Sequence, residues 1–209
     1  MEEAKPAIFD GSVFYDKEQP EDCKDYIMQQ TCFRIKDPEV TLKFYVEILG
    51  MNLIYMDNFE KWGFSNYFVG YCDKSKIPKD QTERRKFAFA TPGCIELTWN
   101  HGTEKEEGRV YNIGNADTTG TQDGQKVRGG FGHIGITVDD VYATCQKFHD
   151  QGVQFHKSPN QGGMKGLAFV KDPDGYLVEV LPKGDFVKQE VDCLGVRLDA
   201  GGTYKDNSK

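Results

Sequence analysis

The segment FGHIGITV at residues 131–138 places one histidine between glycines, a residue type that could bind a metal ion or move a proton. Ile134, Ile136 and Val138 share one face of a predicted strand, because side chains alternate with a period of two. His133 lies on the other face with little bulk beside it. Taken alone, such a residue is more often an ordinary hydrogen-bonded histidine.

Two carboxylates stand in similar surroundings on other predicted strands. In CIELTW at residues 94–99, the apolar side chains share one face and Glu96 occupies the other. Glu179 falls in the last predicted strand, residues 176–181. A lone carboxylate on a strand is usually just solvated, so neither residue indicates a function by itself.

The chain contains one unit twice, and the repeat relates these residues to one another. Aligning His133 with Gln30 also aligns Asp140 with Asp37, and each aspartate is a predicted helix N-cap. Each predicted helix ends at a glycine and is followed by strands. Each unit therefore opens with a potential metal ligand and closes with a carboxylate.

Hydrophobic periodicity predicts the elements of both units. The first helix is expected over residues 38–49. The apolar stripes are Val40, Phe44 and Ile48 in the first helix and Val141, Cys145 and Phe148 in the second. The later strands are expected at 52–56, 66–71, 86–90 and 94–99 in the first unit, and at 153–156, 167–170 and 176–181 in the second.

Packed together, within one chain or between chains, the two units would bring Gln30, Glu96, His133 and Glu179 into one place. This set has mostly oxygen donors and a single nitrogen, unlike the closed cysteine and histidine sets of structural zinc. Harder ligands with room for water suit a catalytic site that holds zinc or another divalent first-row metal.

Several segments resemble the glyoxalase I family of lactoylglutathione lyases, within the vicinal oxygen chelate superfamily. They are QQT at 29–31, FY at 44–45 with LGM at 49–51, IELT at 95–98, GFGHIG at 130–135, MKGLAF at 164–169, and DPDGY at 172–176 followed by Glu179. The likeness spans about residues 26–182 and includes all four ligand positions in order. The long central loop and the N-terminal arm resemble the eukaryotic, zinc-preferring type more than the shorter nickel-preferring bacterial type.

The resemblance implies an α+β fold of two βαβββ modules, paired into eight-stranded curved sheets across a homodimer with shared active sites. It implies isomerisation of the methylglyoxal–glutathione hemithioacetal to S-D-lactoylglutathione through a metal-stabilised enediolate, which detoxifies methylglyoxal. Gln30, Glu96, His133 and Glu179 would bind Zn²⁺, with Ni²⁺ or another divalent metal as alternatives, and glutathione would be the co-substrate. Glu179 would be the main catalytic base, and Glu96 would serve the other substrate enantiomer.

The resemblance also implies a set of substrate-binding residues. The matching positions are Arg34, Asn100, Arg128, Lys157 and Met164. Two departures from the family pattern bear on the affinity or identity of the thiol. An extra glycine in RGGFGH at 128–133 puts the register of Arg128 in question. Gly163 stands where a lysine is common, and Lys165 is a candidate replacement.

Composition and charge exclude several classes of protein. The 209 residues are 38% hydrophobic and 28% charged, as in a globular domain. A net charge of −7 without a basic stripe argues against nucleic acid as a partner. No apolar run is long enough for a membrane span, and the start lacks the pattern of a signal peptide, so we expect a cytoplasmic protein with no membrane partner. The six scattered cysteines are expected to be reduced packing residues.

The expected organisation has five parts: an N-terminal arm (1–24), a first βαβββ module (25–105), a polar inter-module loop (106–128), a second βαβββ module (129–183) and a polar, peripheral C-terminal tail (184–209). We would not assign regular structure to residues 117–126. An alternative function is a non-catalytic small-ligand-binding protein of the same fold, which predicts a broken ligand set. An extradiol dioxygenase would need two histidines and a carboxylate, and the other histidines lie outside the ligand positions.

Overall fold

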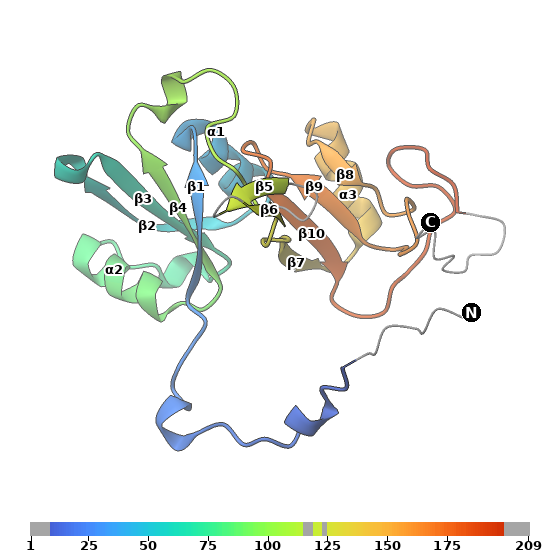
Figure 1. Cartoon of the computed structure of the whole chain (residues 1–209), viewed down its shortest axis with the longest axis horizontal. Helices are drawn as coiled ribbons and strands as arrows, with labels where there is room; N and C mark the ends of the chain where they lie inside the picture. The colour runs from blue at the N-terminus through green and yellow to red at the C-terminus, as the bar shows by residue number, and fades with distance from the viewer. Residues whose placement is uncertain (1–8, 115–118, 123–124, 199–209) are drawn as a thin grey trace.

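The computed structural model describes residues 9–114, 119–122 and 125–198. Two four-stranded sheets lie beside each other, and each has the same strand order along the chain, β1-β4-β3-β2 in the first and β7-β10-β9-β8 in the second (Figure 1). In each sheet the first strand pairs in parallel with the last, and the remaining pairs are antiparallel. The predicted repeat and the α+β class of two βαβββ modules are therefore confirmed.

The elements of the first module are β1 (Gln30–Ile35), α1 (Pro38–Leu42), the π-helix η3 (Lys43–Ile48), β2 (Asn52–Phe59), β3 (Phe64–Gly70), α2 (Gln81–Ala90) and β4 (Cys94–Asn100). Those of the second are β7 (Ile134–Val138), α3 (Val141–Asp150), β8 (Phe155–Lys157), β9 (Ala168–Lys171) and β10 (Leu177–Pro182). Short 3-10 helices are η1 (Ser12–Phe14), η2 (Glu21–Cys23), η4 (Glu60–Trp62), η5 (Lys74–Lys76) and η6 (Thr103–Lys105).

The aspartate caps begin both module helices as predicted. The Asp37 carboxylate accepts from the backbone amides of Glu39 and Val40, and Pro38 occupies the first turn. The Asp140 carboxylate accepts from the amide of Ala143. Both helices therefore start where the sequence repeat placed their starts.

The buried face of the first helix differs from the predicted stripe. Val40 is 49% exposed, whereas Thr41, Phe44 and Tyr45 are buried. The helix changes to π geometry from Lys43, and a π turn rotates the later residues relative to a uniform α-helix. The predicted stripe assumed one uniform period of 3.6 residues through the helix, and it was therefore wrong in placing Val40 on the buried face. In α3 the predicted stripe is correct, since Val141, Cys145 and Phe148 are all buried.

The predicted strand at 86–90 is wrong, because these residues end helix α2. Asp80 caps this helix by accepting from the amide of Glu83. Arg84 reaches across to β2, where its Nε donates to the carbonyl of Ile54 at 2.7 Å and its Nη2 to that of Leu53 at 2.9 Å. Those carbonyls lie at a β-bulge in β2, so the guanidinium satisfies groups that the ladder leaves open.

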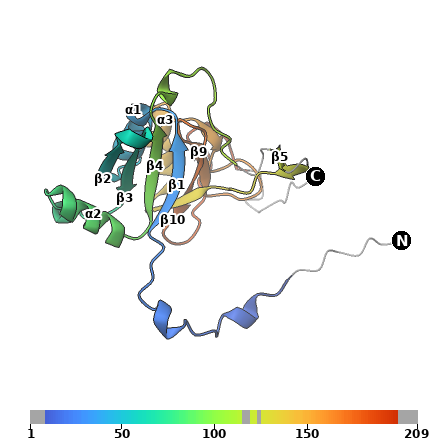
Figure 2. The same ribbon diagram turned by 60° about the vertical axis from the view of Figure 1, so that its left-hand side comes forward.

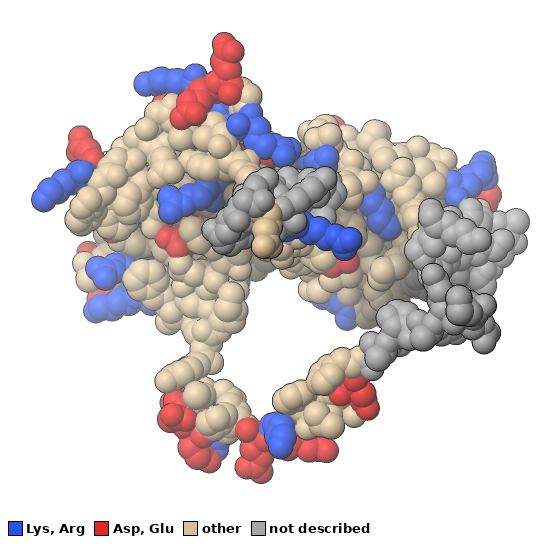
Figure 3. Space-filling view, viewed as in Figure 1, with Lys and Arg blue, Asp and Glu red and all other residues tan. Residues whose placement is uncertain are grey.

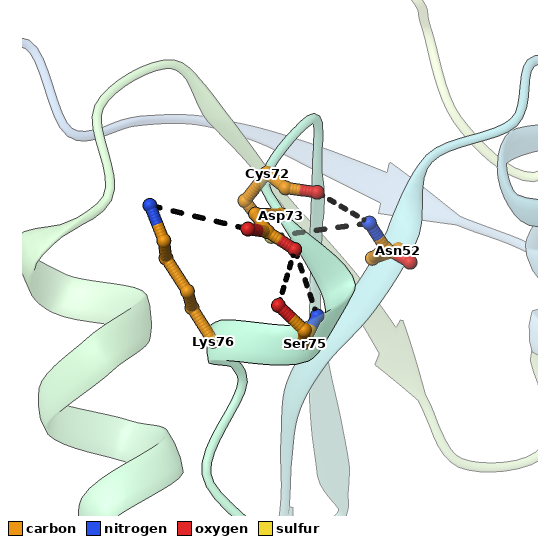
Figure 4. A network of polar contacts seen from close by, with 5 residues as sticks. All are labelled: Asn52, Cys72, Asp73, Ser75 and Lys76. Carbon is orange, nitrogen blue, oxygen red and sulfur yellow. Dashed lines mark hydrogen bonds and ion pairs between the residues drawn. The ribbon is translucent and has the colours of Figure 1, made fainter.

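The connection between β3 and α2 is a compact turn held by side chains (Figure 4). The Asp73 carboxylate accepts from the amide and the hydroxyl of Ser75, at 2.9 and 2.7 Å. The side-chain amide of Asn52 donates to the carbonyl of Cys72 at 2.9 Å, which ties the turn to β2. These contacts lie at the opposite end of the sheet from Asn100, because Asn52 pairs with Gly70 whereas Asn100 pairs with Phe64.

Part of the predicted polar loop forms a hairpin of β5 (Thr119–Gln122) and β6 (Gln125–Arg128), in which Thr119 pairs with Arg128. The glycine-rich sequence has no alternating apolar pattern, so hydrophobic periodicity could not reveal strands that only backbone hydrogen bonds define. Residues 117–118 and 123–124 of the same segment lie outside the described residues.

One hydrophobic core runs through both modules. Phe33 and Leu97 from the first sheet belong to the same buried cluster as Val178 and Val180 from the second. The ring of Phe33 stacks on Tyr176, with centroids 4.3 Å apart and planes 6° from parallel. The modules are therefore joined by packing and not merely by the connecting chain.

The segment 9–29 leaves the start of β1 and runs beneath the two sheets as an extended arm (Figures 1 and 2). Its aromatic side chains are exposed, as expected for an arm, and residues 1–8, which precede it, lie outside the described part of the chain. Acidic side chains line the arm, whereas Lys and Arg are scattered over the body on the face shown (Figure 3).

The C-terminal tail is not peripheral over residues 184–198, which corrects the prediction. Asp192 is buried and accepts from the Ser158 hydroxyl at 2.5 Å and from the Asn160 amide at 3.0 Å. Gly166 has a φ of +80°, and a Cβ there would lie 2.8 Å from the carbonyl of Val187. The tail thus packs closely on the second module, and residues 199–209 lie outside the described ones.

All six cysteines carry free thiols. Burial raises the pKa of Cys94 and of Cys193 to about 11, so these thiols stay protonated near neutral pH. Among the described residues, no helix is long and apolar enough to cross a membrane.

Candidate metal and active site

The first pair of predicted ligands lies on one face of the first sheet. β1 and β4 run in parallel, with Gln30 opposite Cys94 and Cys32 opposite Glu96. This register places Gln30 and Glu96 diagonally on the same face, and the Gln30 amide donates to Oε2 of the Glu96 carboxylate. Gln30 and Glu96 therefore lie together, as the sequence predicts.

A polar network continues from the Glu96 carboxylate across the sheet. The side-chain amide of Asn66 donates to Glu96 Oε1, and the Thr98 hydroxyl donates to Asn66 Oδ1 at 2.9 Å. The Cys32 thiol lies 3.4 Å from the same hydroxyl. Burial raises the pKa of Glu96, and the hydrogen bond from Asn66 and the charge of Arg34 partly offset this rise.

The second pair lies at the matching place in the second module. His133 immediately precedes β7, and its Nε2 is 3.0 Å from Oε2 of Glu179 on β10. The imidazole ring also meets the ring of Phe169 edge to face at 5.0 Å. Glu179 pairs with Gly135 in the parallel ladder, so no side chain from β7 crowds the carboxylate there.

Two of the predicted substrate-binding residues lie together at the far end of the first sheet. Arg34 Nη1 donates to Asn100 Oδ1 at 3.3 Å, and Asn100 Nδ2 donates to the Tyr111 hydroxyl at 2.9 Å. The guanidinium is exposed enough to meet an anionic ligand, and a planar fork suits a carboxylate. Tyr111 had not been predicted, because an isolated tyrosine in a polar loop carries no sequence signal.

The other predicted substrate-binding residues are dispersed in the single chain. Lys157 Nζ donates to the carbonyls of Leu167 and Ser158, and burial and the nearby Lys165 lower its pKa to about 8. Met164 is 55% exposed in the loop that follows. Arg128 is exposed at the end of β6, so the inserted hairpin sets its position.

The suggestion that Lys165 replaces the missing lysine at Gly163 is not supported. Lys165 is buried, and its Nζ donates to the carbonyl of Asn160 at 2.6 Å. The ammonium group therefore serves the loop that carries it.

The two pairs of ligands do not converge within one chain. Among residues 9–114, 119–122 and 125–198, no three histidine, cysteine or acidic side chains come close enough to bind one metal ion. A cleft of about 880 Å³ between the edges β1 and β7 includes Gln30 but none of the other three predicted ligands. This cleft is therefore not the place where the four residues would meet.

The donor set nevertheless fits a divalent metal when both pairs are combined. The first pair offers an amide and a carboxylate, and the second offers an imidazole and a carboxylate. Such oxygen-rich sets with one nitrogen bind zinc, nickel and related ions with room for water or substrate. Asn66 is the residue of this site that the sequence did not reveal, since an amide on a strand usually faces water.

Comparisons with known proteins show which family the chain belongs to. The Glyoxalase/Bleomycin resistance protein/Dioxygenase superfamily matches residues 27–180. The chain is 40% identical over 156 residues to a lactoylglutathione lyase of Pseudomonas putida, covering 75% of this chain and 84% of that protein. It is 39% identical to glyoxalase I of Saccharomyces cerevisiae, covering 74% of this chain and 44% of that longer protein.

A solved structure of trypanothione-dependent glyoxalase I from Leishmania major has a similar fold. The TM-score is 0.52 at 23% identity, and the match covers 76% of this chain and 87% of that one. At this level of identity the likeness concerns the fold alone.

Proposed function

This chain belongs to the Glyoxalase/Bleomycin resistance protein/Dioxygenase superfamily, and we propose that it is a metal-dependent lactoylglutathione lyase, a glyoxalase I. The observation that carries the proposal is the pair of matched half-sites, in which Gln30 meets Glu96 and His133 meets Glu179 at equivalent places in the repeat. Relatives named lactoylglutathione lyase, at 38–40% identity over about three quarters of the chain, support it.

The metal in this proposal is Zn²⁺, held by Gln30, Glu96, His133 and Glu179, as in the eukaryotic type of the family. The amide, imidazole and carboxylate donors support a divalent cation, and Ni²⁺ would fit the same donors. A cation at this place supplies positive charge beside the substrate oxygens, which makes the neighbouring C–H bond more acidic.

The reaction moves one proton between neighbouring carbons of the hemithioacetal of methylglyoxal and glutathione. The Glu179 carboxylate takes the proton from the carbon that carries sulfur and returns it to the adjacent carbon. The hydroxyl on the carbon that carries sulfur loses its proton and becomes the thioester carbonyl. The former ketone oxygen gains a proton and becomes the hydroxyl of S-D-lactoylglutathione, so the isomerisation involves no net gain or loss of protons. Glu96 serves the other enantiomer of the hemithioacetal from the opposite module.

The thiol peptide is proposed to bind along the outer end of the first sheet. Arg34 and Asn100 are in contact there, and the guanidinium suits a carboxylate of glutathione. Lys157 and Met164 would approach the same peptide from the second module. The hairpin that carries Arg128 would determine whether this residue also reaches it.

Each complete site is proposed to combine the first module of one chain with the second module of another. The two half-sites stay apart in a single chain, and this supports a homodimer with shared sites. The free thiols support a reducing compartment such as the cytoplasm as the place of methylglyoxal detoxification.

The test is to mix the purified full chain with ZnCl₂, methylglyoxal and glutathione and to follow the absorbance of the thioester. We expect turnover that a chelator removes and that zinc restores. Glu179→Gln should lower kcat by at least about 100-fold, because the amide cannot accept the proton. A zinc-loaded wild-type chain without activity above background would favour the non-catalytic binding protein.

A further inference from the structure

The two carboxylates of the repeat meet different neighbours, although they occupy equivalent places. Glu96 lies opposite Cys32 on β1 and Phe68 on β3. Glu179 lies opposite Gly135 on β7 and Phe169 on β9. The aromatic neighbour is the same in both modules, so the difference lies on the remaining sides of each carboxylate.

The surroundings of Glu96 are polar and connected. Asn66 donates to Glu96 Oε1, and Asn66 is itself oriented by the Thr98 hydroxyl, which donates to its Oδ1 at 2.9 Å. The amide of Asn66 has its NH₂ group and its oxygen in opposite roles, so the Thr98 contact fixes which end faces Glu96. The carboxylate is thus held from behind while Oε2 faces Gln30.

The surroundings of Glu179 are apolar at the matching positions. The counterpart of Thr98 is Leu181, two residues after the carboxylate, and its side chain lies against Gly135. The counterpart of Asn66 is Leu167, which comes just before Ala168, the first residue of β9, and is 1% exposed. The Glu179 carboxylate lies 3.0 Å from His133, which is itself a predicted ligand, and it also interacts electrostatically with the ammonium group of Lys157.

We propose that Asn66 is a positioning residue that fixes the Glu96 carboxylate for metal binding, a support that Glu179 lacks at the matching place in the second module. This inference rests on the proposed function and deepens it. A rigid ligand on one side keeps the metal in place while the other carboxylate moves a proton. Glu96 is partly buried, and a hydrogen bond to a carboxylate is stronger where water is partly excluded.

The experiment compares Asn66→Leu, which introduces the side chain found at the matching place in the second module, with Asn52→Leu as a control. Asn52 is also a half-buried strand asparagine of the first sheet, but its amide donates to the carbonyl of Cys72 (Figure 4). Asn52 pairs with Gly70, whereas Glu96 pairs with Phe68. The Zn²⁺ dissociation constant is measured by competition with a chromogenic chelator, and kcat and KM are measured at saturating zinc.

We expect Asn66→Leu to weaken zinc binding by about 10- to 100-fold, the usual effect of removing a group that orients a ligand. We expect kcat to fall and KM to change by less than about twofold, since Arg34 and Asn100 are untouched. The Asn52→Leu variant should lose thermal stability but keep the zinc affinity of the wild type. Equal zinc affinities in the two variants would overturn the role of Asn66.

The zinc measurement keeps the two proposals distinguishable. A wild-type chain that binds zinc but shows no turnover overturns the proposed reaction, and the comparison of the variants still decides the role of Asn66. An active wild type whose zinc affinity does not depend on Asn66 overturns this inference alone. A wild-type chain that binds no zinc contradicts both.

Discussion

At the scale of single residues, a buried carboxylate joins the two modules. Asp172 is 4% exposed, its Oδ1 accepts the backbone amides of Asp174 and Tyr176, and its Oδ2 accepts the Tyr45 hydroxyl at 2.9 Å. Tyr45 belongs to the first module and Asp172 to the second. Burial raises the pKa of Asp172 to about 7, although these hydrogen bonds act in the opposite direction.

This pKa predicts a specific dependence of stability on pH. The folded chain keeps a proton on Asp172 between its usual pKa near 3.8 and about 7, where the unfolded chain has lost it. The contribution of this carboxyl to stability is therefore fully present below pH 3.8 and declines as pH rises to about 7. Asp172→Asn mimics the protonated form, so its stability relative to wild type should rise across this window by on the order of a few kcal/mol.

The measurement is the free energy of unfolding in urea at several pH values for the metal-free wild type and Asp172→Asn. Titration of the other groups affects both proteins and cancels in the difference. A difference that stays constant between pH 4 and pH 7 would show that Asp172 is already ionised in the folded chain. Tyr45→Phe removes one of the hydrogen bonds that lower the pKa, and should extend the window upward.

At the same scale, the sequence could predict which residues lie together in each half-site but not which residues support them. Gln30 and Glu96, and His133 and Glu179, were predicted because the repeat fixes their positions on equivalent strands. Asn66 was not, because its role depends on the strand register that places it beside Thr98 and Glu96. Register between distant strands is not encoded in local alternation.

At the scale of elements, local signals competed with one another. Residues 86–90 alternate between aromatic residues and alanine, which fits a strand, yet Asp80 and Glu83 form the start signal of a helix. The helix prevails because Ala88 packs on β2 and Arg84 binds the carbonyls at its bulge. Ile54 and the other partners on β2 are distant in sequence from this helix, so a short stretch of sequence around residues 86–90 does not reveal them.

One buried carboxylate makes several of the contacts of the C-terminal tail over residues 184–198. Asp192 accepts from the Ser158 hydroxyl and from the amides of Asn160, Leu194 and Val196. Burial raises the pKa of Asp192, but these hydrogen bonds outweigh burial and the pKa lies below its usual value. The tail thereby holds the loop between Lys157 and Met164.

We expect Asp192→Ala to lower the free energy of unfolding by about 2–4 kcal/mol, because several buried donors lose their acceptor. Limited proteolysis should then cut within residues 186–198 before the body of the chain. Asp185→Ala is the matched control, since this tail carboxylate is exposed. Equal cleavage rates in the two variants would mean that other contacts hold the tail.

At the scale of the whole molecule, the modules of one chain are fixed relative to each other. The Asp174 carboxylate accepts from the amide of Lys36 at 2.9 Å and from the Thr41 hydroxyl at 3.1 Å, beside the stacked pair of Phe33 and Tyr176. A chain with such an interface does not bring its own half-sites together by a small motion. The sequence repeat alone could not predict how the two modules of one chain are arranged, because the same repeat is compatible with sites formed within one chain and with sites formed between chains.

Shared sites predict that two inactive variants restore activity when they form a mixed dimer. Glu96→Ala damages only the first module, and Glu179→Ala damages only the second. In a mixed dimer both changes fall in one site, and the other site combines two intact modules. The mixed species should therefore regain about half the wild-type turnover per dimer. Co-expression with two different tags and sequential purification isolates it, and light scattering gives its mass.

Sites built within one chain lead to a different result, because every chain in the mixture then carries a damaged site. Activity would remain at the level of each variant alone, and both homodimers taken through the same purification provide that baseline. A chain that yields no doubly tagged species would contradict the dimer itself. Restoration must also disappear when both substitutions are placed in the same chain and paired with a copy that carries them too, because no intact pair of modules then remains.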